Sequence, residues 1–127
     1  MGDGGGGRNA SRRDAPLDVP VERFEQLVAD ALDSIPEELG ELLDNVIVRV
    51  SDEPPGRLYG LYEGIPLTRR HNYGGLAMPD RITIYRRTIL RHATSEQRVV
   101  EMVRRTVIHE VAHHFGISDQ RLRELGW

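Results

Sequence analysis

Cysteine and lysine are both missing from this sequence, and aromatic residues make up only 6% of it. The lack of cysteine excludes disulfide bonds, thiolate metal sites and cysteine nucleophiles, so a transition metal would have to be bound by histidine and carboxylate side chains. No apolar run approaches the roughly 20 residues needed to cross a membrane. The first residues are glycine and arginine, where a signal peptide would be apolar. We therefore expect a cytoplasmic protein without a membrane partner.

The length of 127 residues fits one domain with a modest core. Residues 1–17 are rich in glycine and arginine and contain few apolar side chains, which is typical of a flexible tail. We predict a folded domain over residues 18–127. The formal net charge of −3 gives no indication of general binding to nucleic acid.

Hydrophobic patterning predicts both helices and strands in this domain. Apolar residues at helical spacing predict helices at about 20–34, from 37 to about 43, from about 95 to 115 and at 119–125, and a short helix or turn is expected at 88–92. Apolar runs and alternating patterns predict strands at 45–50, 58–63 and 81–86. Thr94 and Gln97 are spaced as a capping box for the longest helix, and Ser118 can cap the last one.

A histidine motif lies near the end of the longest predicted helix, where His109, Glu110 and His113 form an H-E-x-x-H pattern. Residues four apart lie on one helix face, so the two imidazoles can bind one metal ion. Glu110 follows His109 by about 100° around the axis and can reach a water at that metal without being a ligand. The pattern is typical of a zinc peptidase helix, in which Glu110 acts as general base while activated water attacks a peptide carbonyl.

The residues after this motif offer a third ligand. Gly116 can adopt the left-handed conformation that ends many helices, and the resulting turn would bring Asp119 back toward the two imidazoles. Two imidazoles, one carboxylate and a water complete a catalytic zinc site. We therefore predict one Zn²⁺ per chain, bound by His109, His113 and Asp119. His114 points away from this face and is excluded as a ligand.

Three segments together resemble the small bacterial zincin-like metallopeptidase family: residues 59–68, 81–86 and 109–119. The resemblance covers roughly residues 18–127. It implies a minimal α+β domain in which a small mixed sheet packs on a long active-site helix with flanking helices. It also implies zinc bound by His109 and His113, with Glu110 as the base, and Asp119 matches the third-ligand position of the extended pattern.

The substrate of such a protein would be a peptide or protein. In zinc peptidases a strand beside the active-site helix commonly pairs with the substrate backbone, which requires an exposed sheet edge. We expect strand 81–86 to be that edge. His71, Tyr73 and Tyr85 are candidates for stabilising an oxyanion.

Two other functions fit parts of the sequence. A metal-dependent ribonuclease could use the arginine pairs at 69–70, 86–87 and 104–105. Such enzymes use three histidines, however, and lack the glutamate found here at Glu110. A binding or regulatory module stabilised by zinc is the other alternative, because a small chain gains from a metal staple. Structural zinc sites are normally closed and rich in thiolates, which favours the peptide hydrolase.

Overall fold

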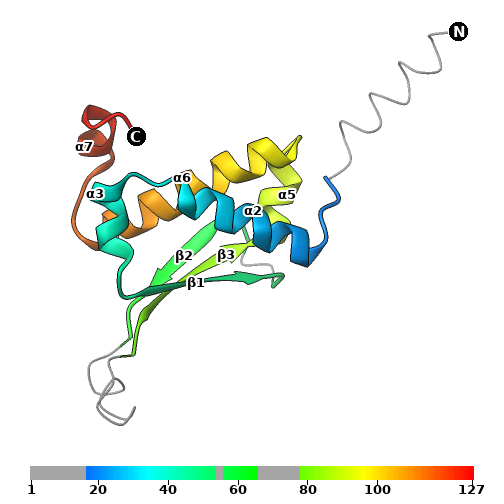
Figure 1. The fold of residues 1–127 in the computed structure, drawn as a ribbon, viewed down its shortest axis with the longest axis horizontal. Coiled ribbons are helices and arrows are strands. Elements are labelled where there is room, and N and C mark those ends of the chain that lie inside the picture. The colour runs from blue at the N-terminus through cyan, green and yellow to red at the C-terminus, as the bar shows by residue number, and fades with distance from the viewer. Residues whose placement is uncertain (1–16, 54–55, 66–77) are drawn as a thin grey trace, which may run out of the picture.

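The computed structural model describes residues 17–53, 56–65 and 78–127 (Figure 1). Within this part of the chain, helices lie over one face of a three-stranded sheet. The predicted tail lies outside the described residues except for Leu17, which packs against the core. His71 and Tyr73 also lie outside the described residues. None of the helices in the described ranges has the length and apolar character needed to cross a bilayer.

The predicted helices and strands are present, with their ends shifted by a few residues. The α-helices are α2 (Val21–Asp33), α3 (Glu37–Gly40), α5 (Arg86–His92), α6 (Glu96–His114) and α7 (Asp119–Glu124). A 3₁₀ turn, η1 (Glu41–Leu43), follows α3 directly. The strands are β1 (Val46–Ser51), β2 (Gly60–Glu63) and β3 (Asp80–Tyr85). This arrangement confirms the predicted α+β class.

The sheet has the order β1-β3-β2, with β1 parallel and β2 antiparallel to β3. The predicted mixed sheet is therefore confirmed, but the expectation that strand 81–86 forms an exposed edge is wrong. That strand is β3, which pairs with a neighbour on each side and has no free edge. Alternation of apolar and polar residues shows that one face is buried, but it does not reveal which strands lie alongside. The edge strand that packs against α6 is β2.

The core lies between the sheet and the two longest helices. Ile82 and Ile84 of β3 are fully buried, and α2 and α6 cover them. The helices contribute Phe24, Leu27, Val28 and Ala31 from α2, and Val99, Val103 and Val107 from α6. Burying one such large apolar side chain contributes about 1.5–3 kcal/mol. This contact fixes α6 against the sheet and so determines where its last two turns lie.

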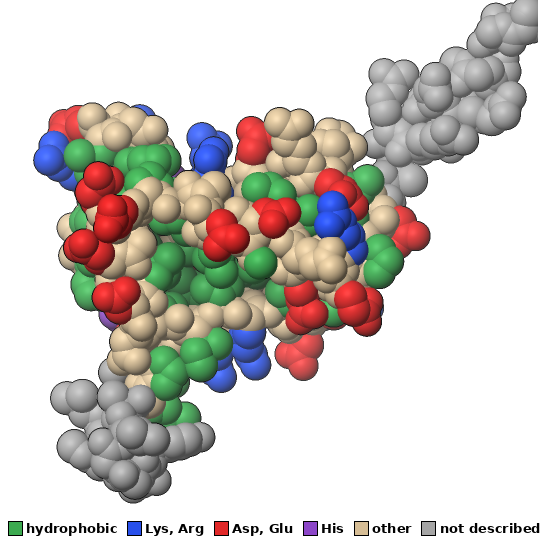
Figure 2. Space-filling model, in the orientation of Figure 1, with side chains coloured by type: hydrophobic (Ala, Val, Ile, Leu, Met, Phe, Trp, Pro, Cys, Tyr) green, Lys and Arg blue, Asp and Glu red, His purple; other side chains and the backbone are tan. Residues whose placement is uncertain are grey.

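The outer surface of the helices, which faces away from the core, is acidic. Figure 2 shows acidic side chains spread over the face that α2, α3 and η1 form. The exposed acidic residues of these elements are Glu22, Glu25, Asp30, Asp33, Glu37, Glu38 and Glu41. The only basic residue in the same three elements is Arg23. Negative charge is therefore concentrated on one surface, and most arginines of the described residues lie elsewhere.

Candidate active site

The longest helix, α6, is capped by a side chain at its start. Ser95 has an extended backbone, and its hydroxyl accepts a hydrogen bond from the backbone N–H of Arg98 at 3.0 Å. The predicted capping box at Thr94 and Gln97 is therefore wrong by one residue. Two hydroxyl residues follow one another here, and only the backbone conformation decides which of them caps the helix.

The end of α6 turns back sharply at Gly116, which has a φ of +81°. The N–H of Ile117 donates to the carbonyl of Ala112 at 2.8 Å, and the N–H of Gly116 donates to that of His113 at 3.1 Å. These two bonds form a Schellman motif, which needs a left-handed residue at this position. Ser118 then caps α7 by accepting from the N–H of Arg121. The predicted turn and cap are both confirmed.

This turn places Asp119 beside the two histidines of the motif. Its Oδ1 lies 3.1 Å from Nδ1 of His109 and 2.7 Å from Nε2 of His113. One candidate ligand atom from each of the three side chains lies within 4.8 Å of the others. Two ligands about 2 Å from a zinc ion at a tetrahedral angle would lie roughly 3.3 Å apart. The cluster therefore fits a zinc ion in both spacing and donor type.

The carboxylate of Asp119 is held in its charged form. The hydrogen bond from His113 lowers the pKa of Asp119 below the ordinary carboxyl value, and partial loss of hydration opposes this shift. The electrostatic interaction with His113 and the hydrogen bond from His109 also lower the pKa of Asp119. A carboxylate must be deprotonated to bind a metal, and the lowered pKa favours that form.

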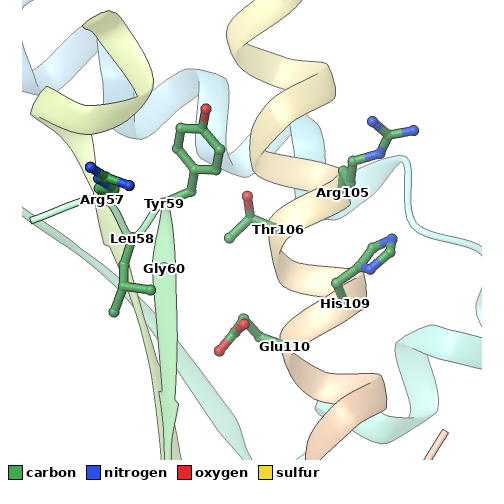
Figure 3. Close-up of a pocket in the computed structure, with 8 residues that line it drawn as sticks. All are labelled: Arg57, Leu58, Tyr59, Gly60, Arg105, Thr106, His109 and Glu110. Atoms are coloured by element: carbon green, nitrogen blue, oxygen red, sulfur yellow. The ribbon is translucent and has the colours of Figure 1, made fainter. Parts of the chain in front are cut away.

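Glu110 lies beside this cluster but faces another way. Figure 3 shows Glu110 and Thr106 pointing from α6 toward β2, whereas Arg105 and His109 leave the helix on a different side. Oε1 of Glu110 accepts a hydrogen bond from the backbone N–H of Tyr62 in β2 at 3.1 Å. Glu110 is therefore separate from the three clustered side chains and is held at the junction of helix and strand.

Tyr62 also explains where the third histidine of α6 lies. The Tyr62 ring stacks on His114 with a centroid distance of 3.9 Å, and its hydroxyl donates to Oδ2 of Asp80 at 2.7 Å. Oδ1 of Asp80 accepts from the N–H of Ile65 at 2.9 Å. His114 thus packs against β2 and is not part of the metal-ligand cluster, as expected. No sequence pattern indicates the contact between Tyr62 and Asp80, because these residues are more than a dozen positions apart.

A cleft of about 290 Å³ lies between the start of β2 and α6. The residues that line it on the strand side are Arg57, Leu58, Tyr59 and Gly60. Those that line it on the helix side are Arg105, Thr106, His109 and Glu110. Tyr85, a predicted oxyanion candidate, is not among these lining residues; it lies at the end of β3, where its N–H donates to the carbonyl of Tyr59.

A second hollow of about 160 Å³ lies on another side of His109. Arg105 and His109 line both hollows. Sequence reasoning considered Arg105 only as half of an arginine pair that could contact RNA. Its spacing, four residues before His109, could have placed it on the face of the first histidine.

Two comparisons with known proteins found similarity to this chain. A family model described as zincin-like metallopeptidase matches residues 41–127. A solved structure of a conserved hypothetical protein from Thermus thermophilus is 24% identical, with 76% of this chain and 94% of that one covered and a TM-score of 0.48. No curated protein matches the sequence. Because the family model matches more than half of the chain, including all of α6 and α7, this protein belongs to the zincin-like metallopeptidase family.

Proposed function

We propose that this protein is a zinc-dependent peptide hydrolase whose catalytic domain spans residues 18–127. One Zn²⁺ per chain would be bound by His109, His113 and Asp119, and Glu110 would be the general base. The observation that carries this proposal is the convergence of two imidazoles and one carboxylate beside a second, separate carboxylate at a cleft. Membership of a metallopeptidase-like family supports the same conclusion.

Zinc at such a site polarises a carbonyl and lowers the pKa of water. Glu110 would accept the proton from that water and transfer it to the leaving amine. The N–H of Tyr62 orients the Glu110 carboxylate toward the cleft through its hydrogen bond to Oε1. The side chains of His109, His113 and Asp119 are about 30%, 47% and 55% exposed, so a substrate can reach them.

The peptide would lie along β2 and not along β3. The carbonyl of Tyr59 accepts a hydrogen bond from the N–H of Tyr85 in β3. In an antiparallel pair of strands every second residue is bonded to the partner strand in this way, and the residues between them direct their backbone groups to the other side. The N–H of Tyr62 then points away from β3 and is bonded to Glu110, and Gly60 is buried. A peptide bound in the cleft would therefore lie beside this strand and pass the general base without pairing with the strand backbone at these two residues.

Metal content tests the proposed ligands first. We expect about one zinc per chain in the wild type and a large loss of zinc in His113→Ala, measured by elemental analysis after dialysis. His114→Ala is the matched control, because His114 is the next residue of the same helix but stacks on Tyr62. Equal loss of zinc in both variants would contradict the assignment of His113.

Peptide cleavage tests the proposed chemistry. Loss of a general base typically lowers the rate by about 10²–10⁴-fold, so Glu110→Gln should abolish most cleavage of a peptide library while it retains zinc. Glu101→Gln, an exposed residue in an earlier turn of α6, is the control and should cleave normally. A zinc-loaded wild type that cleaves no peptide would refute the proposed hydrolase and favour a zinc-stabilised binding module.

A further inference from the structure

Two arginines lie on opposite walls of the cleft beside the candidate active site. Arg57 lies on the strand side, just before β2, and Arg105 lies on the helix side. Arg105 precedes His109 by four residues, which is about one helical turn or roughly 6 Å along the axis. Arg105 therefore lies on the same face of the helix as His109.

Neither arginine has a carboxylate partner among the described residues. The arginines that form ion pairs there are Arg23, Arg81, Arg86 and Arg121. Arg57 and Arg105 are both exposed and belong to none of these pairs. Arg57 and Arg105 line the same cleft and have no internal partner there, so both are available to an anionic ligand.

The charges around the cleft also favour an anionic ligand. Of the described residues that line the two hollows, only Glu110 has a carboxylate side chain, whereas Arg57, Arg104 and Arg105 are cationic. The exposed acidic residues of α2, α3 and η1 are gathered on a different surface (Figure 2). A bound zinc ion would balance the negative charges of Glu110 and Asp119. The net charge of the rest of the cleft is then set by the arginines and is positive.

We propose that the cleft selects peptides with a carboxylate one or two residues from the scissile bond, bound by Arg105 and Arg57. This inference rests on the proposed function for the identity of the ligand as a peptide. The spacing follows from geometry, because one helical turn corresponds to between one and two residues of an extended chain at about 3.3 Å each. Guanidinium forks match carboxylates through two parallel hydrogen bonds.

The apolar residues of the cleft suit the stem of such a side chain. Leu58 and Tyr59 are 46% and 37% exposed, so both have surface available for contact with a ligand. The carboxylate could belong to an aspartate or glutamate side chain or to the C-terminus of the peptide. Both sources present a carboxylate to the arginines, and the experiment below distinguishes them.

Binding tests this inference without relying on cleavage. Zinc-loaded Glu110→Gln would be titrated with fluorescein-labelled peptides that differ only in Glu or Gln, or in a free acid or amide C-terminus, and followed by anisotropy. We expect the carboxylate form to bind about tenfold more tightly, as for a charge-assisted hydrogen bond in a partly exposed site. A preference for Glu identifies the side chain, and a preference for the free acid identifies the C-terminus; either supports the proposal.

The arginines are tested in the same background. Arg105→Gln and, separately, Arg57→Gln should each reduce the preference severalfold while zinc content stays at the parent level. Arg98→Gln is the matched control, because Arg98 is exposed on the same helix but lines neither hollow. A higher salt concentration should weaken the preference, since exposed charges are screened.

Two results would overturn the inference. One is equal affinity for both members of each peptide pair; the other is an equal loss of preference in Arg98→Gln, which would reflect overall charge and not the cleft. Failure of the proposed function would look different, because the wild type would then bind acidic peptides selectively but cleave none of them.

Discussion

The first half of α6 packs into the core, whereas the second half carries the candidate metal ligands. In the first half, Val99, Met102 and Val103 are buried against α2 and the sheet. In the second half, His113 and His114 are exposed and His109 and Glu110 are half-buried. Buried residues continue on the other sides of the second half, at Val107, Ile108, Val111 and Ala112. The helix is thus anchored along its whole length, but only the part from Arg105 onward presents polar side chains to the metal cluster and the cleft.

This difference implies that stability and metal binding are separable in this fold. Removing an exposed imidazole leaves the core intact, and removing a buried methyl group leaves the cluster of ligands intact. A metal bound to the folded state alone would then add to the stability of the protein by mass action. The following variants test the separation, from the largest expected effect to the smallest.

Val103→Ala should produce the largest change in stability. The side chain is fully buried, and deleting two methyl groups costs about 2–3 kcal/mol once the cavity is included. We expect a lower urea midpoint for the metal-free protein, with unchanged zinc affinity of the folded fraction. His113→Ala should show the reverse: an unchanged metal-free midpoint and weak zinc binding. If either variant changed both quantities strongly, the two halves of the helix would be energetically coupled.

Gly60→Ala tests the contact between β2 and the middle of α6, at Thr106. A Cβ at Gly60 would lie 2.7 Å from Cγ2 of Thr106 and 3.0 Å from the carbonyl oxygen of Thr83. Overpacking of this kind typically costs about 1–3 kcal/mol, and here it would also push β2 away from Glu110. We expect lower stability by urea denaturation and slower peptide cleavage.

Two controls distinguish overpacking from a general effect of removing glycine. Thr106→Ser removes Cγ2 alone, so adding it to Gly60→Ala should restore part of the stability. Gly40→Ala should be neutral or stabilising, because a Cβ there meets no atom within 4 Å and the residue is helical. The absence of any restoration by Thr106→Ser would assign the cost to the contact with the Thr83 carbonyl.

Gly116→Ala affects the end of the second half. Gly116 has a φ of +81° and open space around its Cα, so the cost is conformational and amounts to about 1 kcal/mol. Relief of that strain would move α7 and separate Asp119 from the imidazoles. We expect a small loss of stability and a clear loss of zinc affinity, measured by competition with a chelator. An unchanged zinc affinity would mean that the turn tolerates alanine without moving Asp119.

The parts of this fold that could be predicted from the sequence are those set by local spacing. His109, His113 and the turn at Gly116 lie within one helix and its end, where a residue's position follows from its number along the chain. The convergence of Asp119 depends on only three further residues, one of which is the cap Ser118. Such short-range geometry can be worked out from periodicity and capping rules.

The parts that were missed depend on contacts between distant segments. The parallel pairing of β1 with β3 makes β3 central, and no local pattern in residues 81–86 reveals that partner. The bond from Tyr62 to Glu110 joins residues 48 apart in the chain. The cleft arginines are similar, because Arg57 and Arg105 come together only when β2 packs on α6. Strand order and helix docking arise from the whole core, so one-dimensional patterns cannot determine them.

The smallest expected effect concerns the start of α6, in its structural half. Nη2 of Arg23 in α2 lies 2.8 Å from Oε1 of Glu96, and the two side chains are 45% and 44% exposed. The hydrogen bond from Arg23 lowers the pKa of Glu96, and the bond to Glu96 raises the pKa of Arg23. Because the folded-state pKa of Glu96 is the lower one, the pair stabilises the fold above the ordinary carboxyl value of 4.5.

That stabilisation should disappear as the pH falls below 4.5 through the lowered pKa of Glu96. Arg23→Gln should therefore cause a small loss of stability at neutral pH that vanishes in acid, followed by urea denaturation at successive pH values. Arg98→Gln, an exposed arginine in the same first turn, should show no such pH-dependent difference. A difference that persisted in acid would mean that Arg23 contributes through the packing of its apolar stem between α2 and α6 and not through its charge. The first half of α6 would then be held by apolar contacts at its surface as well as in the core.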